Sequence, residues 1–293
     1  MRHELRSLLS IKNTHTMQFS IRHITEYSYS EPLNYSIQQL RLTPQDGFGQ
    51  RVRSWSISVN GQLSQHQDTY GNQVHNMVLD GSHTEIKLIA KGEVETGLTM
   101  TPTQEKLPLT IYLRTTPLTT ADAQIQSFTK PFGTVHTIAD LEKLSALIID
   151  QVPYVKGGTG VYTTAAQAFA ARTGVCQDHA HIFIACCRSL GVPARYVSGY
   201  LFTDDGHLTE SHAWVDAWLT GVGWVSVDVS NRCLANASYV RLATGLDYHD
   251  ACPVSGLRVG GGMETMQVGV NVWQLGWDEN NRQLKKQIEQ TQQ

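Results

Sequence analysis

The chain has 293 residues, of which 41% are hydrophobic and 17% are charged, and its formal net charge is −3. A chain of this length buries a sizeable core and commonly forms two domains. The acidic balance and the lack of a basic run argue against a nucleic-acid partner, because binding phosphates requires clustered Lys and Arg. No apolar run reaches the roughly 18 to 20 residues of a membrane-spanning helix, so a membrane is not an expected partner either.

The first 16 residues differ from those that follow. They carry charges but lack the apolar core of a secretory signal peptide, and a strand pattern begins at Met17. We expect residues 1–16 to form a flexible leader and the protein to be cytoplasmic. The five cysteines are odd in number and include no C-x-x-C pair, so they do not indicate the disulfide framework of a secreted protein.

Residues 17–100 show the pattern of a β domain. Apolar and polar residues alternate over 54–59 and again over 85–88, and Asn-Gly and Asp-Gly pairs between the strands supply turns. We predict an N-terminal antiparallel β-sandwich. Residues 101–118 contain three prolines and are predicted to be a linker.

A second domain is predicted over residues 119–275, followed by a polar, Gln-rich tail over 276–293. Apolar residues recur at helical spacing over 119–130 and 138–151, and a shorter helix is expected at 164–171. Strand alternation is expected in three later stretches: residues 194–228, 257–259 and 265–272.

One cysteine stands directly before an amphipathic helix. Cys176 follows the turn-forming Gly174, and apolar residues recur after it at helical spacing to about residue 190. The free amides at a helix start and a neighbouring imidazolium stabilise a thiolate and so activate a thiol. Asp178 suits the first helical turn, where negative charge is favourable. The pattern predicts a nucleophilic cysteine at the mouth of a helix, with its own backbone N–H as the first oxyanion donor.

A histidine and an aspartate follow on two strand-like runs. His212 begins the run HAWVDAWL, and Asp228 ends the run GWVSVD. In a thiol site, a histidine takes the thiol proton and later gives it to the leaving amine, while an aspartate fixes the tautomer and orientation of the ring. Cys176, His212 and Asp228 therefore form the candidate catalytic set.

The simplest register of these two strands does not bring the two side chains together. A plain hairpin turn over residues 220–223 pairs Leu219 with Trp224, which puts Asp228 opposite Val215. That is three residues short of His212. A bulge or strong twist near the glycines of the turn is needed to close the gap.

Two further histidines lie beside the candidate nucleophile. His179 and His181 form a C-x-x-H-x-H pattern with Cys176, but this spacing puts the two histidines on different faces of a helix. We therefore predict no metal site and no cofactor. Cys186 and Cys187 lie inside the same helix and are expected to be small buried residues.

Several segments match one family in order and spacing. The most specific are YLRTTPLT (112–119), GVCQD (174–178), PARYVSGY (193–200), HAW (212–214) and GWVSVD (223–228), with LRLTP (40–44) and DTYGN (68–72) nearer the start. Over most of residues 17–272 the chain resembles the transglutaminase-like cysteine enzymes, specifically the bacterial branch with its own N-terminal β domain.

The resemblance implies an α+β fold in which an antiparallel β-sandwich precedes a papain-like transglutaminase core. In that core, a helix carrying the cysteine packs on an antiparallel sheet carrying the histidine and the aspartate. By this likeness Cys176, His212 and Asp228 are the catalytic triad.

The expected activity is hydrolysis of peptide or side-chain amides through a thioester, since water is always available as the second acceptor. A transamidase that uses an amine acceptor needs the same three residues. A non-catalytic binding module on the same fold is the third alternative. A peptide or protein amide is the expected partner, and the sequence leaves its identity and the oligomeric state open.

Overall fold

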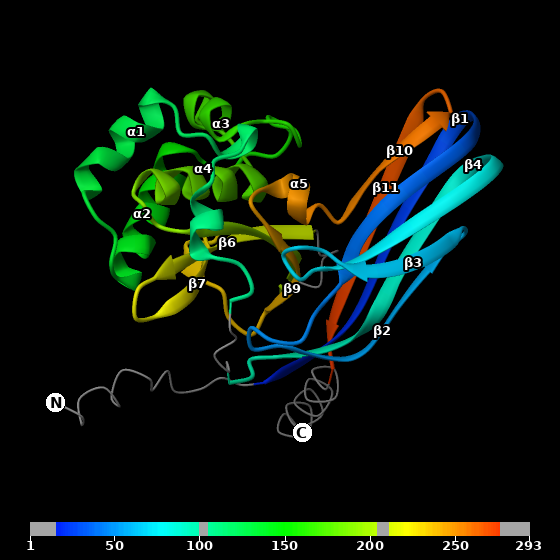
Figure 1. The fold of residues 1–293 in the computed structure, drawn as a ribbon, viewed down its shortest axis with the longest axis horizontal. Helices are drawn as coiled ribbons and strands as arrows, with labels where there is room; N and C mark the ends of the chain where they lie inside the picture. The colour runs from blue at the N-terminus through cyan, green and yellow to red at the C-terminus, as the bar shows by residue number, and fades with distance from the viewer. Residues whose placement is uncertain (1–15, 100–104, 204–210, 276–293) are drawn as a thin grey trace, which may run out of the picture.

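The computed structural model describes residues 16–99, 105–203 and 211–275. They form two antiparallel sheets, one in an N-terminal β domain and one in a domain that also carries the helices (Figure 1). This is the α+β fold that the sequence predicts. The predicted tail, and the predicted leader up to residue 15, lie outside the described residues.

The β domain is built on two long antiparallel strands, β1 (Met17–Thr43) and β4 (Gln73–Thr96). Both strands turn back on themselves at one end of the domain, and their register shifts after Ser28 (Figure 1). Because the two strands are antiparallel, the first half of β1 pairs with the second half of β4, and the second half of β1 pairs with the first half of β4. β2 (Arg51–Val59) and β3 (Gln62–Gln67) pair with different halves of β4.

Apolar side chains from both halves of these strands share one core. Phe19 and Val94 from one pair of halves cluster with Leu40 and Met77 from the other pair, and all four are 0% exposed. Because residues two apart on a strand share a face, the alternating apolar residues of each half point toward the other half. The domain is a β-sandwich, as predicted.

Two strands from the C-terminal part of the chain complete this sandwich. β10 (Val254–Gly260) pairs with the second half of β1 and β11 (Glu264–Gln274) with the first half. Both strands had been expected inside the second domain, so the boundary at residue 275 is corrected: the chain returns to the β domain after residue 253. Alternation identifies strands but not their partners. Gly261 (φ 93°) and Gly262 (φ 57°) make the turn between them, where positive φ favours glycine.

The second domain packs helices against a five-stranded sheet of order β8-β7-β6-β5-β9. Its strands are β5 (Ala194–Leu201), β6 (Ser211–Leu219), β7 (Gly223–Asp228), β8 (Cys233–Leu234) and β9 (Tyr239–Gly245). Its helices are α1 (Ala123–Thr129), α2 (Ile138–Gln151), α3 (Ala165–Ala171), α4 (Cys176–Ser189) and α5 (Tyr248–Ala251). The predicted helix at 138–151 is confirmed, and α4 ends within a residue of its predicted end. No helix among the described residues is long and apolar enough to cross a membrane.

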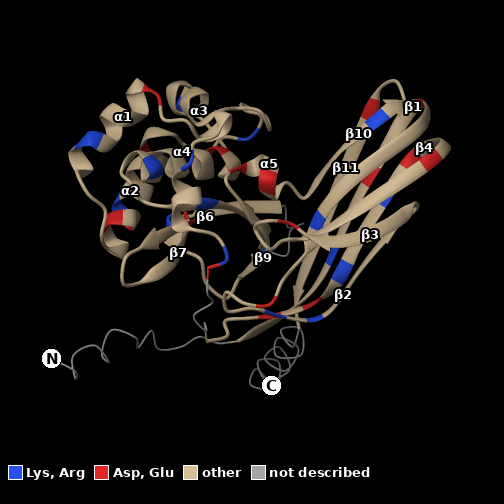
Figure 2. Ribbon diagram, viewed as in Figure 1, with Lys and Arg blue, Asp and Glu red and all other residues tan. Residues whose placement is uncertain are grey.

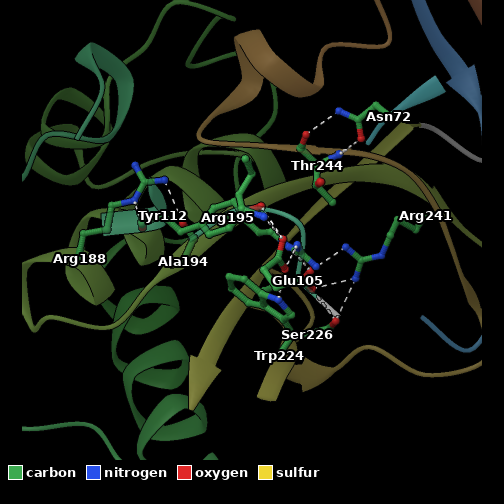
Figure 3. Close-up of polar contacts among 12 residues, drawn as sticks. Asn72, Glu105, Tyr112, Arg188, Ala194, Arg195, Trp224, Ser226, Arg241 and Thr244 are labelled. Atoms are coloured by element: carbon green, nitrogen blue, oxygen red, sulfur yellow. Dashed lines mark hydrogen bonds and ion pairs between the residues drawn. The ribbon is translucent and has the colours of Figure 1, made fainter. Parts of the chain in front are cut away.

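Two amide side chains of the β domain pair with the edge strand β9. Asn72 donates Nδ2–H to the carbonyl of Thr244 at 2.7 Å and accepts the N–H of Thr244 at 2.8 Å (Figure 3). Gln50 forms the same pair of bonds with the backbone of Arg241, both at 2.9 Å. Each amide thus satisfies the free edge of β9 as a further strand would, and the two domains are held in a fixed relation.

The described part of the predicted linker is packed into the structure. Glu105 accepts hydrogen bonds from Trp224 Nε1 at 2.7 Å and from Arg195 Nη1 at 3.1 Å (Figure 3). The short 3-10 helix η2 (Leu109–Leu113) buries Tyr112, whose carbonyl accepts from a guanidinium of α4. A second 3-10 helix, η3, spans Pro117–Thr119. Lys and Arg are interspersed with Asp and Glu over both domains (Figure 2).

Candidate active site

The candidate nucleophile lies at the first position of a helix that local contacts fix tightly. Cys176 begins α4 and is partly exposed, whereas the rest of the helix is almost wholly buried. The buried carboxylate of Asp178 accepts the N–H of Val175 at 2.8 Å and the hydroxyl of Thr159 at 2.6 Å. A Cβ at Gly174 would stand 2.7 Å from the Cβ of Asp178, so this position requires glycine. The turn before the helix is therefore rigid.

The other two candidate residues lie on neighbouring strands, His212 near the start of β6 and Asp228 at the end of β7. The structure pairs Leu219 with Gly223 and Val215 with Val227. The predicted pairing of Leu219 with Trp224 was wrong by one residue, because positive φ at two glycines of the turn tightens the loop to residues 220–222. Asp228 is thereby brought one residue closer to His212.

The side chains cover the distance that remains. His212 Nε2 lies 2.6 Å from Asp228 Oδ2, and the carboxylate is 0% exposed. The imidazole also faces Cys176, because both line the same cleft and the Cys176 side chain contributes to the pKa of His212. Since Asp228 occupies Nε2, the nitrogen left for the sulfur is Nδ1. The structure thus brings all three predicted residues together.

Burial and hydrogen bonds shift the pKa of His212 in opposite directions. Burial alone lowers its pKa, but the hydrogen bonds and charges of Asp228 and Cys176 outweigh burial and raise the pKa of His212 to about 10. Burial likewise raises the pKa of Asp228, and the hydrogen bonds and charge of His212 bring it below its usual value. At neutral pH the pair is therefore an imidazolium beside a carboxylate.

Two residues that the sequence analysis did not single out hold the carboxylate. Asn231 Nδ2 donates to Asp228 Oδ2 at 2.7 Å, and the hydroxyl of Tyr239 donates to the same oxygen at 2.7 Å. The ring of Trp214 stacks near His212, with centroids 6.2 Å apart, and meets the ring of Tyr239 edge on at 5.3 Å. These contacts fix both members of the pair.

The two histidines beside Cys176 are engaged inside the protein. His179 bonds to the hydroxyl of Ser230 and to the carbonyl of Val152, both at 2.8 Å, so both of its ring nitrogens are occupied. His181 accepts the N–H of Tyr248 at 3.2 Å. Burial lowers the pKa of both imidazoles, that of His181 to about 4. Both therefore stay neutral and serve packing.

A cleft of about 500 Å³ opens between the two domains at the candidate nucleophile. Cys176, His212 and Tyr248 line it from the second domain. Strand β1 and strands β10 and β11 of the sandwich line the opposite wall, largely with apolar side chains. The sandwich is therefore part of the site, which explains why the chain returns to it.

We expect Tyr239→Phe to lower kcat about ten-fold, because a hydrogen bond to a charged group contributes about 1.5 to 3 kcal/mol. The loss of this donor leaves more negative charge facing His212, which raises the pKa of the imidazolium. The alkaline limb of the kcat/KM profile, which reports the free enzyme and is expected near pH 10, should then move to higher pH. Tyr35→Phe, on the exposed face of the sandwich, is the control. A lower kcat with an unmoved limb would mean that Tyr239 acts only in packing.

The sequence matches known proteins over both domains. Residues 19–95 match the bacterial transglutaminase-like N-terminal region, and residues 123–229 match the core of the transglutaminase-like superfamily. An uncharacterized protein of Mycobacterium leprae is 30% identical over 278 residues, which cover 86% of this chain and 97% of that protein. A protein-glutamine gamma-glutamyltransferase of Pseudomonas aeruginosa is 30% identical over 125 residues, covering 39% of this chain and 18% of that enzyme.

One solved structure has the same overall fold. A candidate cysteine protease from Cytophaga hutchinsonii superposes with a TM-score of 0.73 over 90% of this chain and 92% of that chain, at 23% sequence identity. The match extends over the β-sandwich as well as the core, since it covers nine tenths of both chains.

Proposed function

The chain belongs to the transglutaminase-like superfamily, in the bacterial group with its own N-terminal region, and on that premise we propose that it hydrolyses peptide or side-chain amides through a thioester on Cys176. The observation that carries this proposal is the position of His212, which bonds to Asp228 at 2.6 Å and lines the same cleft as Cys176 at the helix start. A nucleophile, a base and a group that orients the base are the minimum for covalent acyl transfer.

In the first half of the reaction, the Cys176 sulfur attacks the amide carbonyl carbon and a C–S bond forms. The carbonyl oxygen becomes an oxyanion. The backbone N–H of Cys176 is a donor to it, since amides of the first helical turn have no partner within the helix. His212 gives its proton to the amide nitrogen as the C–N bond breaks, which leaves a thioester and a free amine.

In the second half, water attacks the thioester and gives a proton to His212. The C–S bond breaks, the acid leaves, and the sulfur and the imidazole return to their starting states. Asp228 keeps the ring oriented through both proton transfers and stabilises its charge.

The charge of the cleft supports water as the acceptor over an amine. Among the described residues that line it, none is acidic. A protonated amine would meet no carboxylate on this wall, whereas water needs none. Transamidation is the alternative that this argument disfavours.

The test is to incubate the protein with a peptide library, with and without a primary amine, and to identify the products by mass spectrometry. Hydrolysis gives acids whether or not the amine is present. Products that carry the amine would show that the protein is a transamidase and not a hydrolase. A Cys176→Ala sample run in parallel must give neither product, and turnover by that variant would overturn the proposal.

We further expect iodoacetamide near neutral pH to label Cys176 before the other cysteines, because alkylation needs both a thiolate and access. Cys186 and Cys187 are 0% exposed, and burial raises the pKa of both thiols. The half-buried Cys233 is the closest comparison, and burial raises its pKa as well. Peptide mapping by mass spectrometry reads the order of labelling. Faster labelling of Cys233 would remove Cys176 as the nucleophile.

A further inference from the structure

Strand β11 leaves one edge unpaired next to the cleft. Among the described strands it pairs only with β1, so the N–H and C=O groups of its other edge have no ladder partner. The strand is 11 residues long, and its one charged residue is Glu264, at its start. Long apolar edges are usually shortened, charged or covered in natural sheets. An edge kept open beside an active site indicates that something pairs with it.

Apolar residues on this strand follow the period of two that lines one face. Met266, Val268 and Val270 all line the cleft, and their exposure falls from 56% and 48% to 2% along the strand. Their partners on β1 line the cleft too, with Met266 opposite Tyr27 and Val268 opposite Thr25. The stripe therefore runs from the open surface into the cleft that holds Cys176.

We infer that the substrate is an extended polypeptide segment with apolar side chains, which adds to the free edge of β11 as a further strand. This inference rests on the proposed function. The backbone of β11 supplies the main-chain hydrogen bonds of strand addition, and alternate side chains of the peptide contact Met266 and Val268. Met266 and Val268 share the cleft with Tyr248 and Cys176, so a peptide bound along β11 reaches the cleft that holds the sulfur.

Continuity with the cleft favours the substrate over a second copy of the chain as the occupant. A partner strand lying along the whole edge would cover Met266 and Val268, which line the entry to Cys176. A peptide in the same place has its reactive amide beside the sulfur. The sandwich wall of the cleft carries no Lys, Arg, Asp or Glu among its described lining residues, so a charged peptide side chain facing it would lose hydration without gaining a partner there.

The test measures binding separately from turnover, in the Cys176→Ala background. Fluorescence anisotropy follows a labelled peptide of alternating Val and Ser and a second peptide in which Asp replaces each Val. We expect the Val peptide to bind and the Asp peptide to bind at least about ten-fold more weakly. Methylation of backbone nitrogens at alternate residues should abolish binding in one register and spare it in the other, as strand addition requires.

Variants of the protein test whether the peptide binds along β11. Met266→Asp and Val268→Asp should each raise the Kd about ten-fold or more. Leu257→Asp removes an apolar side chain that is 77% exposed on the neighbouring strand β10 and does not line the cleft. This matched control should change the Kd less than about two-fold. Equal melting temperatures of the three variants would show that each remains folded.

Several outcomes would overturn the inference. They are equal binding of the Val and Asp peptides, unchanged binding by Val268→Asp, and tolerance of both methylation registers. A concentration-dependent dimer that Val268→Asp dissociates, with no peptide binding, would identify a second copy as the occupant. Hydrolysis of p-nitrophenyl acetate by the unaltered chain, dependent on Cys176, tests the proposed function separately. Its persistence alongside failed peptide binding would sink the inference and leave the thiol chemistry standing.

Discussion

Cys176→Ala should abolish turnover, and His212→Ala should lower kcat by roughly three or more orders of magnitude. The first change removes the atom that forms the thioester. The second removes the group that protonates the leaving amine and deprotonates water, and no other side chain among the described residues both bonds to Asp228 and lines the cleft that holds Cys176. Single-turnover kinetics with a reactive ester and with a peptide amide would separate the two steps of proton transfer.

Asp228→Ala should lower kcat less than His212→Ala does, because the orientation of the ring is easier to replace than the transfer of a proton. Asn231 Nδ2 lies 3.5 Å from His212 Nε2 and remains near the ring after the carboxylate is gone. Thermal melts of all three variants check that each is folded. Near-normal turnover by a folded His212→Ala protein would refute the assignment of this residue as the base.

The helix that carries the cysteine could be predicted in detail because its signals are local. Gly174, the cysteine and the acidic residue at 178 lie within five positions, and the apolar spacing that follows defines α4 to within one residue at its end. The sandwich was predictable for the same reason, since alternation reveals strands. The pairing of β10 and β11 with β1 was not, because it joins segments more than 200 residues apart in sequence.

The residues of the candidate site also fall into those that the sequence predicts and those that it does not. Cys176, His212 and Asp228 follow from residue type and order along the chain. Asn231 and Tyr239 do not, because Asn231 reaches Asp228 from the turn that follows β7, where Arg232 is left-handed (φ 51°), and Tyr239 reaches it from β9, which pairs with β5. No short motif encodes such a turn. An Asn and a Tyr shortly after the aspartate were the available signal, and its meaning depends on the turn after β7 and on the pairing of β9 with β5.

A second large effect is expected on the stability of the protein, at Asp216, which does not line the cleft. Asp216 is 0% exposed and lies between two guanidinium groups. Its carboxylate accepts from Arg195 Nε at 2.9 Å, from Arg241 at 2.7 and 2.8 Å, and from the hydroxyl of Ser226 at 2.6 Å (Figure 3 shows its partners). Burial alone raises the pKa of Asp216, but the two guanidinium groups outweigh burial and lower the pKa well below 3.8.

Asp216→Ala should lower the free energy of unfolding by about 3 to 5 kcal/mol, because it leaves buried guanidinium groups without their shared counter-charge. Asp150→Ala is the matched control. Asp150 pairs with Arg232 at 2.5 Å, but their side chains are 59% and 54% exposed, so its loss should cost less than about 1 kcal/mol. Urea unfolding followed by circular dichroism measures both values.

The difference in the free energy of unfolding between the wild type and Asp216→Ala should also depend on pH, and it should shrink only on the acid side. The folded-state pKa of Asp216 lies below its unfolded value of 3.8, so the stabilisation is fully present above that pH. It declines as the pH falls below 3.8 toward the folded-state pKa, because the unfolded chain then binds the proton more readily. A constant difference between pH 5 and 8 that shrinks below about pH 4 is expected. A difference of less than 1 kcal/mol at pH 7, equal to that of the exposed control, would show that the two guanidinium groups are solvated and that this cluster does not hold the sheet together.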